Sequence, residues 1–143
     1  MYEGGIRVPG IAVWPEKINS GTRVEVPCYT SDYFPTIAHV LGIDIMQYNP
    51  PYDGDNLMHY WKGEKNKRQQ PMMFQFENQY AVIDNDFKLY GTVEALPQLY
   101  NIVEDNAEAH DLSSQQQSTL SNLISRYNTW SQSLQNSALA GDY

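Results

Sequence analysis

The hydrophobic pattern of this 143-residue chain changes along its length. Residues 1–47 contain one short apolar run and one stretch with helical spacing, joined by a polar connection. From residue 71 onward, short apolar segments alternate with tight polar turns and are followed by a long amphipathic stretch. The intervening residues 48–70 are irregular and rich in turn-forming residues. We therefore predict two structural parts, 1–47 and 71–143, joined by a linker over 48–70.

The first part predicts a strand followed by a helix. The uniformly apolar run Ile11–Trp14 is closed by a proline, which is typical of a strand covered on both faces in an α/β sheet. Apolar residues then recur at helical spacing over 34–41, and Gly42 is a natural helix stop. One further helical turn is expected over 57–61. The Gly-rich residues 2–10 ahead of the strand indicate a polar turn.

The second part predicts a small antiparallel sheet. Its short apolar segments are separated by turn-forming residues, as in a series of hairpins. These predicted strands are Met72–Glu77, Tyr80–Asp84, Phe87–Tyr90 and Gln98–Ile102. Between Ser113 and Ala140, apolar residues repeat at intervals of three and four, which predicts one long amphipathic helix. We expect an α+β fold with a sheet of about four strands packed by this C-terminal helix, preceded by the strand and helix of the first part.

The charge distribution also indicates two parts and excludes several function classes. The chain carries a formal net charge of -8, with a sequence pI near 4.6. Residues 1–70 hold seven basic and eight acidic residues, whereas residues 71–143 hold two basic and nine acidic ones. This acid excess argues against binding to nucleic acid or to an anionic membrane surface. The first residues do not form a signal peptide, and no apolar run approaches the roughly 20 residues of a membrane span.

Candidate nucleophiles and metal ligands are few. The single cysteine, Cys28, excludes an internal disulfide and a cysteine-cluster metal site. No activating cation adjoins it in the sequence, so we expect a buried, inert thiol. Asp53 and Asp55 around Gly54 slightly resemble a calcium loop, but the EF-hand ligand pattern does not continue. The chain contains no Gly-rich phosphate loop and no G-x-S-x-G sequence.

The three histidines have different expected environments. His39 lies inside the predicted helix, where a structural histidine is expected, and His110 lies in a solvated capping region. His59 adjoins Trp61 and has two interpretations, a structural side chain or a residue within reach of a substrate, of which the first is favoured. No two histidines have the i, i+4 spacing of a helical zinc site. The residues by themselves identify no active site.

Five segments, in order over about 110 residues, carry a resemblance to one enzyme family. In the first part of the chain, Glu3–Pro9 matches the pattern E-G-G-x-R-x-P, and Asp32–Gly42 matches D-x-x-P-T-x-x-x-x-x-G. Asp53–Leu57 is similar to D-G-x-S-L, with Asn56 in place of serine. In the second part, Phe87–Leu89 is similar to W-K-L, and Leu99–Glu108 is similar to L-Y-N-L…D-P-x-E, with Asn106 in place of proline. In this order the segments resemble the formylglycine-dependent sulfatases, which share the alkaline-phosphatase-like α/β fold.

The resemblance implies that the chain covers only the C-terminal third of such an enzyme. In the family, a Cys or Ser in a C/S-x-P-x-R sequence becomes formylglycine, whose hydrated aldehyde attacks sulfur while calcium polarises the sulfate oxygens. This chain has no C/S-x-P-x-R sequence, because Cys28 is followed by Tyr29-Thr30-Ser31. The family's calcium ligands and sulfate-binding lysine lie upstream of the matching region. We therefore expect no catalytic residue, metal ligand or cofactor here, with calcium and formylglycine belonging to the full-length enzyme.

Supporting roles are what the resemblance transfers to this sequence. Glu3, Gly4, Gly5 and Arg7 are expected to shape the turn that presents the missing lysine, as an active-site scaffold. In family members the small C-terminal sheet-and-helix part packs beside the mouth of the active site. By that analogy, His59, Trp61 and the 74–80 region are the expected substrate rim.

Three interpretations of function are carried forward. The first is the C-terminal portion of a sulfatase, inactive until joined to its missing N-terminal domain, which acts on a sulfate ester. The second is a non-catalytic truncated module that binds a partner or a sugar. The third is part of a related phosphodiesterase or phosphonate hydrolase. Under the first, exposure of the strand and helix of residues 1–47 predicts self-association of the chain, and the family favours a periplasmic or secreted compartment.

Overall fold

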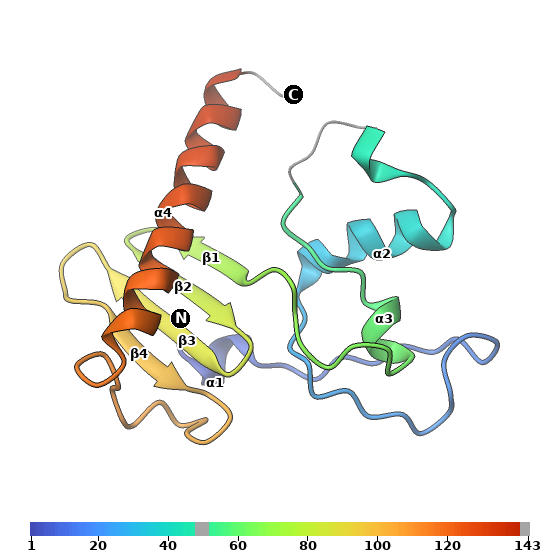
Figure 1. Ribbon diagram of the computed structural model, residues 1–143, viewed down its shortest axis with the longest axis horizontal. Coiled ribbons are helices and arrows are strands. Elements are labelled where there is room, and N and C mark those ends of the chain that lie inside the picture. The colour runs from blue at the N-terminus through green and yellow to red at the C-terminus, as the bar shows by residue number, and fades with distance from the viewer. Residues whose placement is uncertain (48–51, 141–143) are drawn as a thin grey trace. The chain divides into compact units, whose positions relative to one another are not determined.

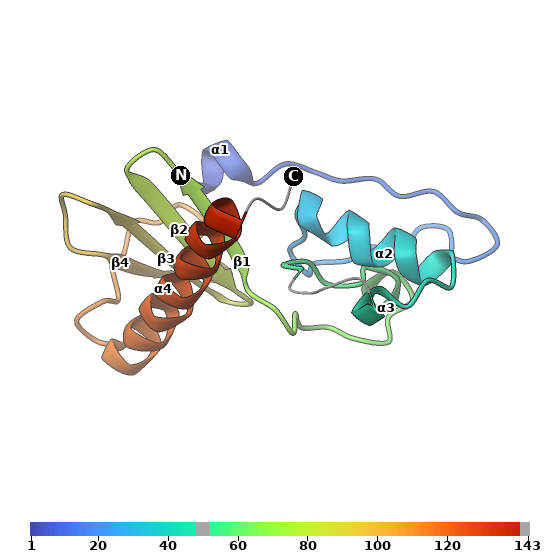
Figure 2. The ribbon, with the colours of Figure 1, turned by 90° about the horizontal axis from the view of Figure 1, so that it is seen from above.

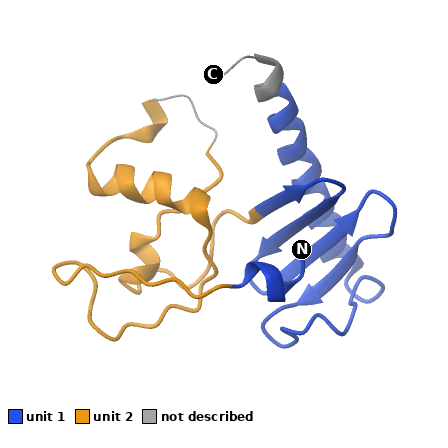
Figure 3. Cartoon of the chain, turned by 180° about the vertical axis from the view of Figure 1, so that it is seen from behind, with its two compact units in different colours: residues 1–7, 73–143 blue, residues 8–72 orange. Residues whose placement is uncertain are grey.

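The chain divides into two compact units, which Figure 3 distinguishes by colour. This computed structural model describes residues 1–47 and 52–140, so residues 48–51 of the predicted linker lie outside the described residues. One unit, called the sheet unit below, combines Met1–Arg7 with Met73–Tyr143. The other, called the helical unit, is Val8–Met72. The sheet unit is therefore assembled from two segments of chain that the helical unit separates in sequence.

The predicted antiparallel sheet is confirmed. Among the described residues it has four strands in the order β1-β2-β3-β4, with β2 and β4 each antiparallel to β3. The strands are β1 (Met72–Phe76), β2 (Gln79–Asp84), β3 (Phe87–Thr92) and β4 (Gln98–Asn101). The predicted C-terminal helix is α4 (Gln117–Ala140). Each strand boundary lies within two residues of its predicted position, because alternating burial and polar turns are local signals.

Helix α4 covers one face of the sheet and closes its hydrophobic core (Figure 1). Leu123 is buried against Val82, Leu89 and Leu99, which come from β2, β3 and β4. Each such fully buried aliphatic side chain contributes roughly 1.5–3 kcal/mol relative to exposure. Beside this cluster the ring of Tyr127 stacks on Tyr80, with 4.1 Å between centroids.

A glycine makes room for that aromatic stack. Tyr80 of β2 lies directly opposite Gly91 of β3 in the ladder. A Cβ atom added at Gly91 would overlap the ring of Tyr80. The ring therefore lies over the bare backbone of β3, which is a common reason for glycine inside a strand.

The N-terminal residues cover the opposite face of the sheet. Side chains alternate along a strand, so Lys88 and Tyr90 point away from α4 while Leu89 points toward it. Helix α1 (Glu3–Ile6) lies on this second face (Figure 2), where the ring of Tyr2 contacts Tyr90 at 4.8 Å. The sequence predicted only a Gly-rich turn here. The turn is instead wound into one helical turn, closed by the Arg7 amide donating to the Glu3 carbonyl oxygen at 2.9 Å.

The helical unit confirms both predicted helices. They are α2 (Tyr33–Val40) and α3 (Met58–Trp61), accompanied by the short 3-10 helices η1 (Thr30–Asp32) and η2 (Ile45–Gln47). Gly42 follows α2 with φ of 70°, the left-handed conformation of a helix stop. On α2, Pro35, Thr36 and Ala38 are buried. Most of its large apolar side chains are exposed, including Phe34, Ile37 and Val40.

The predicted strand at Ile11–Trp14 is wrong. This stretch, within the described range 1–47, is extended but belongs to no strand. Ile11 is 92% and Val13 82% exposed. An apolar run becomes a strand only when a neighbouring strand satisfies its backbone groups, and the described part of the helical unit supplies none.

No helix in the described part of the chain is long and apolar enough to span a bilayer.

Candidate functional site

A buried charged cluster, here called the Lys88 clasp, joins the N-terminal residues to the sheet. It consists of Glu3, Lys88 and Glu108. The Lys88 ammonium lies 3.0 Å from Glu3 Oε1 and 2.7 Å from Glu108 Oε1. The Glu3 amide also donates to Glu108 Oε2 at 2.6 Å. The Lys88 side chain is fully buried, and those of Glu108 and Glu3 are 2% and 8% exposed.

Further hydrogen bonds extend the clasp along the first residues of the chain. The Met1 amine donates to Gln79 Oε1 at 2.9 Å, and the Tyr90 hydroxyl donates to the same oxygen at 3.3 Å. Glu108 itself has φ of 54°, a left-handed conformation that costs a non-glycine residue energy. The protein thus holds Glu108 in a strained backbone position from which it reaches both Lys88 and Glu3.

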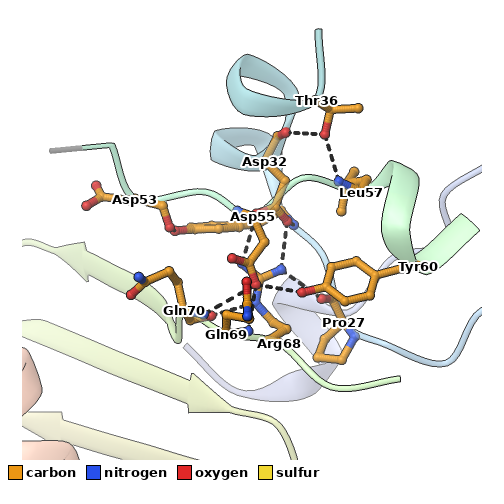
Figure 4. A network of polar contacts seen from close by, with 11 residues as sticks. Pro27, Asp32, Thr36, Asp53, Asp55, Leu57, Tyr60, Arg68, Gln69 and Gln70 are labelled. Carbon is orange, nitrogen blue, oxygen red and sulfur yellow. Dashed lines mark hydrogen bonds and ion pairs between the residues drawn. The ribbon is translucent and has the colours of Figure 1, made fainter. Parts of the chain in front are cut away.

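The helical unit is organised around a second buried network (Figure 4). The Arg68 guanidinium donates to both carboxylate oxygens of Asp32, each at 2.8 Å, and both side chains are fully buried. Arg68 also donates to the backbone carbonyl oxygens of Pro27 at 3.0 Å and Gln70 at 2.9 Å. The arginine therefore ties the 27–32 stretch to the 68–70 stretch of the unit, and the neighbouring Asp32 raises the pKa of Arg68 against the effect of burial.

Asp55 forms the other half of this network. Its amide donates to Asp32 Oδ1 at 2.7 Å, and its Oδ2 accepts from the Tyr60 hydroxyl at 2.7 Å and from the Gln69 amide at 2.9 Å. Burial and Asp55 raise the pKa of Tyr60, which keeps the phenol protonated. No buried side-chain oxygen or nitrogen of this network lacks a hydrogen-bond partner within the described part of the chain, so the network is a structural core rather than a reactive site.

Gly54 explains why this network can close. A Cβ atom at Gly54 would overlap the backbone carbonyl of Ser31. Its absence lets the Asp53–Leu57 segment lie against the start of α2. There the Thr36 hydroxyl donates to the Asp32 carbonyl oxygen at 2.6 Å and accepts from the Leu57 amide at 2.9 Å. Two sequence segments of the resemblance therefore meet in one hydrogen-bonded core.

The predicted supporting residues fall into the two units. Glu3 lies in the clasp, whereas Gly4, Gly5 and Arg7 are exposed. In the helical unit, His59 and Trp61 are half-buried. His59 Nδ1 lies 2.7 Å from Glu64 Oε2, and its ring lies 5.8 Å from that of His39.

The 74–80 region lines an open hollow of the sheet unit, about 470 Å³ in volume. Its walls include Gln75, Phe76 and Glu77 of this region with Trp130 and Leu134 of α4. Phe76 is exposed, and the ring nitrogen of Trp130 is buried with no hydrogen-bond partner among the described residues. The lining of the hollow combines aromatic rings with amide and carboxylate groups.

The residues that the structure describes do not fit a calcium site. The described residues contain no group of three or more His, Cys, Asp or Glu side chains able to hold a metal ion. Of the Asp53–Asp55 pair, Asp55 is committed to Tyr60 and Gln69.

The prediction of a buried cysteine is wrong, because Cys28 is exposed. The predicted inertness has a different basis, which the structure supplies. Partial desolvation and the nearby Asp32 raise the pKa of the thiol, despite the opposing charge of Arg68. A raised pKa reduces the thiolate fraction and hence the nucleophilicity of the residue.

Sequence reasoning missed Lys88, Glu108, Asp55 and Arg68 as buried charges. The sequence did contain a signal that Lys88 is buried. It is the single charged residue inside an otherwise apolar strand segment, and the alternation of side chains places it on a covered face. Arg68 lies in a run of charged residues that resembles a solvated linker. Nothing local distinguishes it from Lys65 or Lys67.

Comparison with known proteins gives a consistent set of relatives. No protein-family model matches the chain. Human steryl-sulfatase is 35% identical over 79 residues, which cover 55% of this chain and 13% of the relative. The rat steryl-sulfatase is 37% identical over 79 residues, covering 55% and 14%. Human arylsulfatase H is 33% identical over 75 residues, covering 52% and 13%. The chain thus matches about an eighth of the length of these curated relatives.

Solved structures share the fold over more of the chain. The crystal structure of Ps i-CgsB has a TM-score of 0.68 and 26% identity, covering 82% of this chain and 27% of that chain. Its complex with k-i-k-neocarrahexaose gives the same values. A protein described with glycosaminoglycan metabolism in Bacteroides thetaiotaomicron has a TM-score of 0.52 at 17% identity, covering 68% of this chain and 24% of that chain. At that identity the likeness concerns the fold alone.

Proposed function

We propose that this chain, which is homologous to the sulfatases over part of their length, is the C-terminal portion of a sulfuric ester hydrolase. The observation that carries the proposal is the 35% identity to human steryl-sulfatase over 79 residues that make up only 13% of that protein. The reacting groups then lie in an N-terminal portion. The chain has no C/S-x-P-x-R sequence for formylglycine, and its buried carboxylates are committed to protein partners. We therefore expect it to be inactive by itself.

The scaffold role falls to Glu3, Gly4, Gly5 and Arg7. Glu3 is buried and paired with Lys88, so its carboxylate serves to hold the segment rather than to contact substrate. The two glycines and Arg7 are exposed, and none of their side chains takes part in the clasp. They are the part of this segment that we assign to shaping the approach to the active site.

Substrate selection is the second role that we assign to the chain. The proposed rim residues are His59, Trp61 and the 74–80 region. Aromatic side chains offer flat apolar faces to a steroid or a sugar ring, and the neighbouring amide and carboxylate groups offer hydrogen bonds. Steryl-sulfatase is named for a steryl ester, and Ps i-CgsB has been solved with an oligosaccharide. An assay should therefore include both a steryl sulfate and a sulfated oligosaccharide.

The partner implied by this function is the N-terminal portion itself. Helix α2 exposes Tyr33, Phe34 and Ile37, each at 55–57%. A contiguous exposed apolar face of this kind marks an interaction surface. The chain covers 27% of the solved structure Ps i-CgsB, so most of such an enzyme is available to cover α2. In the isolated chain, the same face promotes self-association.

A sulfate-release assay tests the proposal. The chain alone should show no turnover of an aryl sulfate, a steryl sulfate or a sulfated oligosaccharide. The complete protein, with its N-terminal portion, should release sulfate from at least one of them. The matched control is the complete protein with the nucleophile of its C/S-x-P-x-R sequence replaced by alanine, which should be inactive.

Two outcomes contradict the proposal. Robust turnover by the pure 143-residue chain would require a different mechanism from residues that we consider structural. Hydrolysis of a phosphate diester or a phosphonate, without sulfate release by the complete protein, would instead place the chain in a related hydrolase of the same superfamily.

A further inference from the structure

We propose that Lys88 and Glu108 are positioning residues, which together with Glu3 fix the N-terminal segment 1–7 on the sheet and thereby set where the preceding portion of the enzyme joins the sheet unit. This inference rests on the proposed function, because it assumes that a catalytic portion precedes Met1. It concerns residues other than those assigned there, since Lys88 and Glu108 lie on a strand and a loop far along the chain.

Chain connectivity does not hold the segment in place. Glu3 is 85 residues from Lys88 and 105 residues from Glu108 in sequence. Residues 8–72, which separate them, form a unit of their own. Helix α1 has four residues, and so short a helix is not stable in isolation. The position and the helical form of the segment therefore depend on its contacts with the sheet.

Those contacts are directional. Lys88 is contacted by one carboxylate from the segment and by one from the 102–108 loop. The Glu3 amide donates to the second carboxylate, so Glu108 bridges the lysine and the segment backbone. Apolar packing tolerates small shifts, whereas buried charges and hydrogen bonds depend strongly on the distance and direction of their partners. The clasp therefore specifies a single placement of the segment.

The clasp is anchored on the most constrained part of the sheet unit. Lys88 lies in β3, between β2 and β4, opposite Ile83 on one side and Tyr100 on the other. All three of these residues are buried. A functional group is held most accurately when its support is a rigid, packed element. The clasp thus holds the segment against β3, an inner strand of the sheet.

Hydrogen exchange on the 143-residue chain tests the placement. The main variant combines Lys88→Met, Glu3→Gln and Glu108→Gln, which removes all three charges and leaves none buried without a partner. Amides of Glu3, Gly5 and Arg7 should exchange roughly tenfold faster or more, while those of Val82 and Leu89 keep their protection. The matched control is Arg126→Met, since Arg126 pairs with Asp84 on the exposed surface of the same unit. It should change neither set of amides.

A second variant keeps the test possible if the triple variant does not fold. Glu108→Gln keeps the shape of the side chain and removes one charge, and it should raise exchange at the same three amides. Unchanged protection of residues 3–7 in whichever variant folds would overturn the clasp as the anchor. Equal loss of protection at Leu89 would also overturn it, because the clasp would then support the whole sheet rather than the segment.

Kinetics of the complete enzyme test the consequence. A displaced segment should raise the KM for an aryl sulfate by about fivefold or more and lower kcat, since small misplacements of binding groups weaken catalysis. A purely structural role would reduce only the fraction of active enzyme and leave KM unchanged, which would overturn the inference. Absence of sulfate release by the unmodified complete protein would count against the proposed function alone, because the exchange experiment still decides whether the clasp anchors the segment.

Discussion

Arg68 and Asp32, 36 residues apart in sequence, form a fully buried bidentate ion pair at 2.8 Å in both hydrogen bonds. The pair joins the C-terminal end of the helical unit to the start of α2. Few large apolar side chains are buried in this unit, and those on α2 are mostly exposed. The polar network therefore carries much of the cohesion that a hydrophobic core would otherwise supply.

The Arg68→Lys variant should destabilise the helical unit even though it keeps the charge. Lysine lacks the planar fork that donates to both oxygens of Asp32 and to two backbone carbonyls. We expect a loss of roughly 1–3 kcal/mol, because buried acceptors are left without donors. Hydrogen exchange at the Asp55 and Leu57 amides, which donate into the network, measures the change.

The matched control for this variant is Arg23→Lys. Arg23 pairs with Glu25, but the two side chains are 86% and 70% exposed. Exposed pairs contribute roughly 0–1 kcal/mol, so this change should have little effect. Equal effects of the two substitutions would show that burial of the Arg68 pair has no special importance.

The Gly54→Ala variant should destabilise the helical unit more than the small size of the added methyl group suggests. The added methyl group would meet the Ser31 carbonyl, which is backbone and cannot rotate away. We expect a destabilisation at or above the roughly 1–3 kcal/mol of ordinary overpacking. Thermal unfolding followed by circular dichroism measures it. Gly10→Ala is the control, since a Cβ there meets no atom within 4 Å, and a similar loss in both variants would contradict the close approach at Gly54.

Alkaline pH should destabilise the helical unit. Burial raises the pKa of Tyr29 to about 12, and burial with Asp55 raises the pKa of Tyr60. The pKa of a tyrosine phenol in the unfolded chain is about 10. A phenol whose pKa is higher in the folded state contributes to the free energy of unfolding below pH 10, and this contribution is lost as the pH rises above 10. Urea titrations from pH 8 to 11 should show stability falling above about pH 10.

The control for the pH experiment is Tyr60→Phe. This variant lacks the raised phenol and should lose less stability over the same pH interval, although it starts from a lower value because Asp55 loses a donor. Parallel pH profiles for the two proteins would contradict the role of Tyr60. Phenolate absorbance should show the corresponding late ionisation in the original chain.

The exposed face of α2 should control self-association of the chain. Ile37→Gln removes an apolar side chain that is 57% exposed, and it should lower the apparent mass by light scattering at high concentration. Leu96→Gln is the control, because Leu96 is 89% exposed in the sheet unit, away from α2 in sequence. A monomer at all concentrations in the original chain would contradict the expectation.

The sequence determined most of the sheet unit. Strands β1 to β4 and helix α4 follow from alternation, turn residues and helical spacing, since each of these signals is local and needs no knowledge of distant residues. The same kind of signal failed at Ile11–Trp14, where a local apolar run has no partner strand in the described structure. It also failed at Glu3–Ile6, where contacts with the sheet turn a Gly-rich stretch into a helical turn.

Only the tertiary structure decided which charges are buried. Lys88, Glu108 and Arg68 carry ordinary charged side chains in sequence, and each is buried because partners 36 to 105 residues away neutralise or hydrogen-bond it. Burial of a charge depends on such pairing rather than on the residue type. The sequence by itself therefore specified most of its elements and its likeness to the sulfatases. The fold alone determined that the segment Glu3–Arg7 of that likeness is held by the sheet, and that Asp32 and Asp55 serve as structural acceptors.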